Sequence, residues 1–107
     1  MTAPAFHEQS QGPNAPPELV LSGRWTLRSI ASVGTEWRTR LRGSAARTDM
    51  QWNCLAIEAL DSAGAMLLWH VWGRRFPAQL QISPEHRGIF ERIAAAEEAS
   101  REAAALH

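Results

Sequence analysis

The chain has 107 residues, 45% hydrophobic and 21% charged, and its 11 basic and 11 acidic side chains give a formal net charge of zero. This composition is that of one globular domain, and a domain of this size leaves little room for a large cofactor cradle. The charge balance excludes the long-range attraction that a basic protein exerts, so neither nucleic acid nor an anionic membrane is expected as a partner.

Cys54 is the only cysteine, which excludes an internal disulfide and a thiolate metal cluster. Its neighbours Trp52 and Leu55 indicate a buried structural thiol rather than a nucleophile. No apolar run approaches the roughly 20 residues that a membrane-spanning helix needs, and no signal peptide opens the chain. We therefore expect a cytoplasmic domain.

Residues 1–17 carry four of the six prolines and show no apolar periodicity. They cannot offset the entropy of ordering, so they are predicted to form a disordered tail. The apolar run at residues 19–21 then predicts a first strand, and Val20 is expected to be buried on both faces like an inner strand.

The next element is predicted to be one amphipathic helix that Thr26 caps and Gly43 ends. Its apolar stripe recurs at spacings of three and four residues and comprises Ile30, Val33, Trp37 and Leu41. Residues 50–54 predict a second strand, and residues 55–60 are expected to be a connection.

A second helix is predicted from Ser62 to about Arg75, stopped by Pro77, and residues 79–82 predict a third strand. Ser83 caps the last helix, which has Pro84 in its first position. The inward stripe of that helix is predicted to be Ile89, Phe90, Ile93 and Ala96.

The alternation of strands and helices predicts an α/β fold, a mainly parallel sheet of three to four strands with about three helices packed on it. The domain is expected to span residues 18–96. Residues 97–107 are rich in Ala and Glu and predict a helix extension or a linker beyond the core.

Ser62 lies at the predicted start of the second helix, beside backbone N–H groups without intrahelical partners and near the positive end of the helix dipole. A phosphate on its hydroxyl would be stabilised there, so Ser62 is a candidate phosphoacceptor or switch. The alternative is that Asp61 or Ser62 only caps the helix, the usual role of these residue types.

The helix after Ser62 has apolar residues on two sides. The two stripes comprise Ala65, Leu68 and Trp72 on one side, and Met66, Trp69 and Gly73 on the other. A small one-sheet domain cannot bury both stripes, so the second is a candidate contact surface. The alternative is that Trp69 folds back onto the sheet edge and leaves only Met66 outside.

Residues 60–68 read Leu-Asp-Ser-Ala-Gly-Ala-Met-Leu-Leu, and residues 21–27 read Leu-Ser-Gly-Arg-Trp-Thr-Leu. Together they resemble a STAS domain, the fold of the anti-sigma-factor antagonists. The two motifs look most like those of bacterial STAS domains fused to, or partnered with, permeases of Mla-type ABC transporters that move phospholipids. The resemblance covers about residues 18–96.

The resemblance implies a regulatory or assembly domain without enzymatic activity, which docks on the transporter's ATPase subunit through the start of its second helix. The expected interface comprises Asp61, Ser62, Ala63, Gly64, Met66 and Trp69. The ATPase subunit and the permease are the expected partners, and the permease would hold the domain at the inner face of the inner membrane. The 107 residues are then either a small subunit or a domain of a chain that continues into the permease.

The alternative is an anti-sigma-factor antagonist, in which an anti-sigma serine kinase phosphorylates the serine that matches Ser62. That branch usually ends its central strand with Asp-Leu-Ser, and the acidic residue lies close to the phosphoacceptor. This chain departs from the pattern with Asn53, Cys54 and Leu55.

An enzyme is the third class considered. The four histidines are spread over a tail, two predicted helices and the terminus, with no pair at metal-ligand spacing. No glycine-rich loop precedes a helix in a phosphate-cradling pattern, and Ser62 has no evident base. We therefore expect no catalytic residue, no metal and no cofactor.

Overall fold

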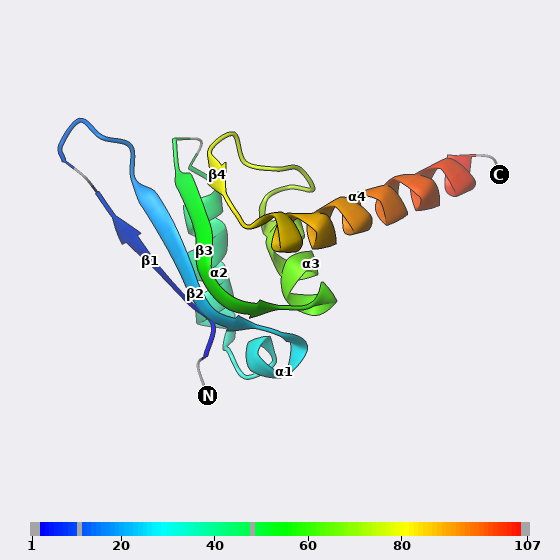
Figure 1. Cartoon of the computed structure of the whole chain (residues 1–107), viewed down its shortest axis with the longest axis horizontal. Helices are drawn as coiled ribbons and strands as arrows, with labels where there is room; N and C mark the ends of the chain where they lie inside the picture. Colours follow the sequence, from blue (N-terminus) through cyan, green and yellow to red (C-terminus); the bar gives the residue numbers. More distant parts are fainter. Residues whose placement is uncertain (1–2, 11, 48, 106–107) are drawn as a thin grey trace.

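The computed structural model describes residues 3–10, 12–47 and 49–105. In chain order, the elements are β1 (Ala5–Gln9), β2 (Glu18–Trp25), α1 (Leu27–Ile30), α2 (Thr35–Ala45), β3 (Gln51–Leu60), α3 (Ser62–Val71), β4 (Leu80–Gln81) and α4 (Pro84–Ala105) (Figure 1). The strands form one sheet in the order β1-β2-β3-β4, in which β2, β3 and β4 are parallel and β1 is antiparallel to β2. The predicted α/β class and mainly parallel sheet are confirmed.

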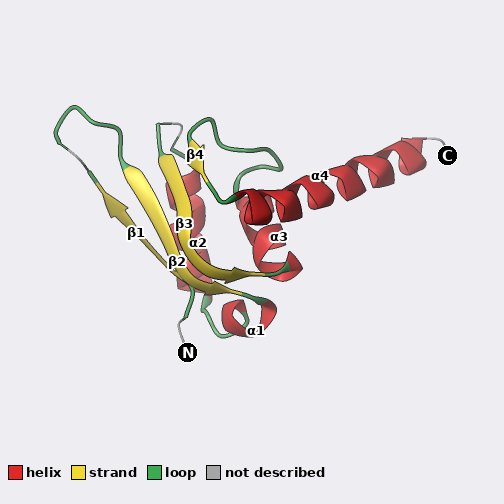
Figure 2. Ribbon diagram, viewed as in Figure 1, coloured by secondary structure: helices red, strands yellow, loops and turns green. Residues whose placement is uncertain are grey.

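The helices cover only one face of the sheet (Figure 2). Along β2, Leu19, Leu21 and Trp25 are fully buried, whereas Val20 between them is half-buried. On the opposite face of β3, Leu55 is 58% exposed. The expectation that Val20 is buried on both faces is therefore wrong, because α4 packs against α3 instead of crossing to the second face.

Aromatic rings fill much of the space between the sheet and the helices. Trp25 is fully buried and tilts against Trp37 at a centroid distance of 5.3 Å. A second group of rings packs between β3, α3 and α4 and comprises Trp52, Trp69, Trp72, Phe76 and Phe90. These bulky rings let a small sheet bury a continuous core.

The first predicted helix is wrong in outline, because the structure divides it into α1 and α2. The Ser32 hydroxyl donates to the carbonyl of Ser29, and the Arg38 guanidinium donates to that of Ile30. These bonds satisfy carbonyl groups at the end of α1 without continuing the helix. Extended backbone at Gly34 then starts α2, and Gly43, predicted as the end, lies inside it.

Residues 55–60, expected to be a connection, continue β3 to Leu60. The strand contains a register shift there: Val20 pairs with Asn53, but Ser22 pairs with Ala56. The side-chain oxygen of Asn53 accepts a hydrogen bond from the N–H of Leu55 and stabilises this bulge. Asn53 therefore lies within the strand and not at its end, and the acidic residue that follows the strand is Asp61.

Residues 5–9, assigned from the sequence to a disordered tail, form β1 instead. Phe6 pairs in register with Leu21 and packs edge-on against Trp37, with ring centroids 5.2 Å apart. Together with the hydrogen bond from the Ser44 hydroxyl to Glu8, this pairing and packing order a segment that has no periodic apolar pattern. The tail prediction for residues 1, 2 and 11 lies outside the described residues.

The last elements follow the prediction in part. Ser83 caps α4, because its hydroxyl accepts a hydrogen bond from the N–H of His86. Phe90 is fully buried, but Ala96 is exposed and Ala94 packs on the core instead. Beyond Glu97, which still contacts α3, the helix α4 projects from the body of the domain as far as residue 105 (Figure 1). None of the helices described is long and apolar enough to span a bilayer.

Candidate docking site at the start of helix α3

Asp61 ties the starts of two helices together. One carboxylate oxygen accepts a hydrogen bond of 3.0 Å from the N–H of Gly64 and so caps α3. The other accepts a 2.9 Å bond from the N–H of Leu27, the first residue of α1. Of the two capping residues that the sequence left open, Asp61 has this role, and the Ser62 hydroxyl is not needed for it.

Gly64 lies directly against the end of β2. A Cβ placed on Gly64 would be 2.7 Å from the carbonyl carbon of Trp25 and in collision with its oxygen. The N–H of Asp61 donates to that same carbonyl oxygen at 3.3 Å. Only glycine allows the first turn of α3 to approach the β2 backbone this closely.

Three side chains around this junction face solvent. Ser62 is exposed, Met66 is 38% exposed and Leu27, at the start of α1, is 64% exposed. We call these three residues the docking surface. Leu27 was not predicted as a site residue, although it lies in the first motif. The sequence pattern merged α1 and α2 into one helix, and that pattern did not show that Leu27 would be exposed.

Trp69 does not belong to the docking surface, and its assignment to the partner interface is wrong. Its ring is only 5% exposed and packs edge-on against Phe76, with Phe90 also alongside. Its indole N–H donates to a carboxylate oxygen of Glu97 on α4 at 2.7 Å. The alternative in which Trp69 folds inward is correct, but it packs under α4 and not on the sheet edge.

Glu97 joins α4 to α3 through several partners. Its second oxygen lies 3.4 Å from the Nε2 of His70 and 4.0 Å from the Nε of Arg74. Partial burial raises the pKa of Glu97, but the hydrogen bonds from Trp69 and His70 and the positive charge of Arg74 lower the pKa further, so the net shift is downward. The ionised carboxylate therefore holds α4 in place.

A groove of about 510 Å³ runs beside the docking surface, between α1, α2 and α3. Its lining includes Leu27 and Met66, with Arg38 and Arg42 of α2 on one wall. A hollow of about 330 Å³ on the other side contains both Ser62 and Arg92 of α4. Arginine side chains therefore lie on both sides of the exposed start of α3, and the second hollow also contains the Asp61 carboxylate.

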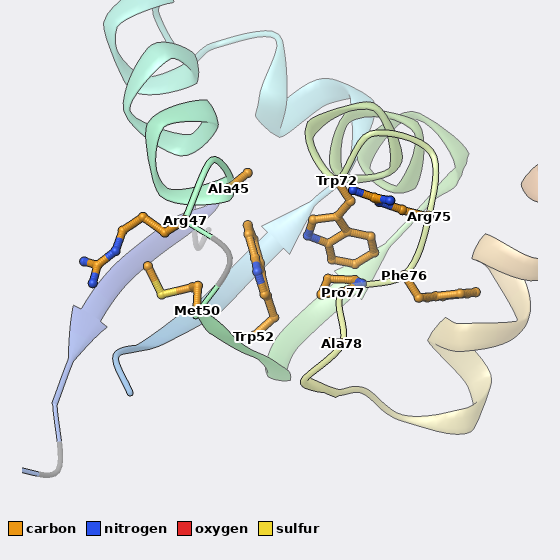
Figure 3. Close-up of a pocket in the computed structure, with 9 residues that line it drawn as sticks. All are labelled: Ala45, Arg47, Met50, Trp52, Trp72, Arg75, Phe76, Pro77 and Ala78. Atoms are coloured by element: carbon orange, nitrogen blue, oxygen red, sulfur yellow. The ribbon is translucent and has the colours of Figure 1, made fainter. Parts of the chain in front are cut away.

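A further hollow of about 360 Å³ lies at the opposite end of β3, away from Ser62 (Figure 3). The indole N–H of Trp72 is buried there without a hydrogen-bond partner, but it points towards the ring of Trp52, with centroids 5.6 Å apart and planes at 84°. This edge-to-face geometry gives the N–H a weak π acceptor. Arg47 points away from the hollow and pairs with Asp49 at 3.4 Å. Because these polar groups already have partners, we interpret the hollow as a gap in the packing and not as a binding site.

Nucleophilic and metal chemistry have few candidates in the described part of the chain. Cys54 is fully buried, and burial raises the pKa of its thiol to about 12, so the prediction of a buried structural thiol is confirmed. Across residues 3–10, 12–47 and 49–105, no group of three or more His, Cys, Asp or Glu side chains is placed to hold a metal ion. The start of α3 is left as the strongest candidate site.

Comparison of the chain with protein-family models, with curated proteins and with solved structures finds no match.

Proposed function

We propose that this chain is a STAS-type regulatory or assembly domain of an Mla-type ABC transporter for phospholipids, without enzymatic activity of its own. In this proposal the domain is cytoplasmic and docks on the ATPase subunit through the start of α3. The permease, as a second subunit or as a continuation of the chain, places the domain at the inner face of the membrane.

The observation that carries the proposal is the junction of the two motif segments. Residues 21–27 and 60–68 carry the resemblance, and they meet through the bond from Leu27 to Asp61 and through the contact of Gly64 with Trp25. These contacts hold the starts of α1 and α3 in one fixed geometry. A fixed geometry under exposed apolar side chains suits recognition of another protein.

The exposed side chains supply the second support. Leu27 and Met66 are two of the three large hydrophobic residues that the described chain exposes, and both line the groove together with Ala63, which follows Ser62. An apolar pair next to a helix start would gain free energy when a partner covers it. The proposal is tested by co-expressing the chain with the ABC ATPase subunit encoded beside it and measuring whether the two copurify and whether ATP hydrolysis changes.

A second candidate function is that of an anti-sigma-factor antagonist switched by phosphorylation of Ser62. The observation that favours it is the hollow shared by the exposed Ser62 and Arg92, since a guanidinium can pair with a phosphate. Incubation with a cognate serine kinase and ATP should then add one phosphate, and Ser62→Ala should prevent it. If the mass of the protein does not change after incubation with the serine kinases encoded nearby, this candidate function is rejected.

A further inference from the structure

The groove between α1, α2 and α3 has an apolar floor. The residues that form this floor are Leu27, Ile30, Ala31, Ala63, Met66, Leu67 and Val71. Leu27 and Met66 rise from it with 64% and 38% of their surfaces exposed. An apolar trough between helices has the shape that accepts one face of another helix.

The wall formed by α2 is positively charged. Arg38 and Arg42 are four residues apart in α2, so they project from the same side of the helix, one turn from each other. No acidic side chain lines the groove, and neither arginine forms an ion pair with any part of the chain that the structure describes. Two like charges at this spacing repel, and a partner that brought carboxylates would relieve the repulsion.

We propose that this groove, which we call the basic groove, binds an amphipathic helix of the partner protein that carries two acidic residues one turn apart beside its apolar face. The apolar residues of that helix would cover Leu27 and Met66, and its carboxylates would pair with Arg38 and Arg42. The inference rests on the proposed function, in which the partner is the ATPase subunit, and it specifies the chemistry of the docking segment.

A protein helix suits the basic groove better than a lipid surface. The two arginines line a concave trough, whereas a flat bilayer would meet the protein's convex parts first. Two cations on a chain of zero net charge also fall short of the clusters of about four to eight basic residues that hold proteins to anionic lipids. Vesicles of anionic phospholipid therefore serve as the competing probe.

The test uses the whole chain and a synthetic helical peptide of about 16 residues with leucines on one face and two glutamates one turn apart beside them. A matched peptide has lysines in place of the glutamates. Fluorescence anisotropy should show that the acidic peptide binds about tenfold more tightly than the basic one, since like charges in the groove repel the latter. Arg42→Glu should weaken the acidic peptide about fivefold or more, and high salt should reduce the difference.

Arg42 is the better residue to change, because Arg38 also donates to the Ile30 carbonyl and its loss would disturb the end of α1. The control is Arg101→Glu, the same charge change at an exposed position on α4. Equal binding of the two peptides, binding of neither, or no effect of Arg42→Glu would overturn the proposal. So would binding of the anionic vesicles with the same dependence on Arg42.

The groove and the proposed function can fail separately. If wild-type chain captures the ATPase subunit and Arg42→Glu captures it equally well, the basic groove is not the docking point, but the proposed function stands. If the peptides are discriminated as expected and the ATPase subunit is not captured, the groove binds an acidic helix of some other partner.

Discussion

The Asp61 carboxylate accepts a 2.9 Å hydrogen bond from the N–H of Leu27, across 34 residues of sequence. The same carboxylate caps α3 through Gly64. The exposed side chains at the start of α1 and at the start of α3 therefore share one anchor. Any partner that touches Leu27 and Met66 together depends on that anchor for their spacing.

Replacing Asp61 should loosen both helix starts at once. Asp61→Ala removes two hydrogen bonds to backbone N–H groups, and one cap is worth about 1 kcal/mol, so we expect the free energy of unfolding to fall by about 2 kcal/mol. Urea unfolding followed by tryptophan fluorescence measures this. Asp49→Ala removes an exposed carboxylate that forms a surface ion pair with Arg47, and it should change stability by less than about 0.5 kcal/mol. Equal effects of the two substitutions would mean that Asp61 is not an anchor.

Replacement of glycine by alanine should have opposite effects on stability at Gly64 and at Gly43. Gly64→Ala forces a methyl group into the Trp25 backbone and should destabilise the fold by about 3 kcal/mol or more, although alanine favours helices. Gly43 is inside α2, and apart from its chain neighbours and the backbone of its own helix nothing lies within 4 Å of an added Cβ, so Gly43→Ala should stabilise the protein by about 0.5 to 1 kcal/mol. Thermal unfolding of both variants decides the matter, and a harmless Gly64→Ala would contradict the close approach of α3 to β2.

The contact between α3 and α4 should weaken in acid. Because the pKa of Glu97 is lowered in the folded state, its contribution is fully present above the ordinary pKa of a glutamate. The contribution is lost as the pH falls from that value through the lowered pKa. Fluorescence of Trp69 and stability measurements from about pH 6 to about pH 3 should follow this loss.

Glu97→Gln isolates that part of the pH dependence. The variant should be less stable than the wild type at neutral pH and should lack the fall assigned to Glu97 as acid is added. Glu98→Gln is the control, because the neighbouring Glu98 is exposed on the same helix. If Glu97→Gln and wild type lose stability in parallel, the bonds to Trp69 and His70 do not hold α4.

The Cys54 thiol should resist modification as long as the protein is folded. It is fully buried and its pKa is raised to about 12, so almost no thiolate forms near neutral pH. Reaction with a thiol-specific disulfide reagent should proceed at the rate of unfolding and accelerate in urea. Rapid labelling without denaturant would contradict the burial of β3 under the helices.

The sequence predicted the elements whose signals are local. Ser83 and Pro84 mark the start of α4, and the apolar run at residues 19–21 marks β2, because capping chemistry and strand propensity act over a few residues. Asp61 was found as one of two possible caps, since either residue type serves. Only the distance to Gly64 distinguishes the two.

The elements that the sequence misplaced depend on contacts between distant residues. Trp69 has the helical spacing of an exposed stripe, but Phe76, Phe90 and Glu97 from later in the chain cover it. β1 pairs with β2 and packs on α2 through contacts from later in the chain, among them Phe6 against Trp37 and Glu8 with Ser44. The sequence did not predict the basic groove, although Arg38 and Arg42 are one helical turn apart. The groove lies between α1, α2 and α3, and it exists only because the chain breaks between α1 and α2.

The most direct test of the proposed docking function is capture of the ATPase subunit by variants of the docking surface. Wild-type chain, Ser62→Glu, Met66→Glu and Leu55→Glu are each immobilised at equal amounts of folded protein, and the bound ATPase subunit is quantified. Leu55 is the matched control, since it is 58% exposed on the open face of the sheet, away from α3. We predict that Ser62→Glu and Met66→Glu lose the complex while Leu55→Glu keeps it. Retention of the complex by Met66→Glu, or equal loss with Leu55→Glu, would contradict docking through the start of α3.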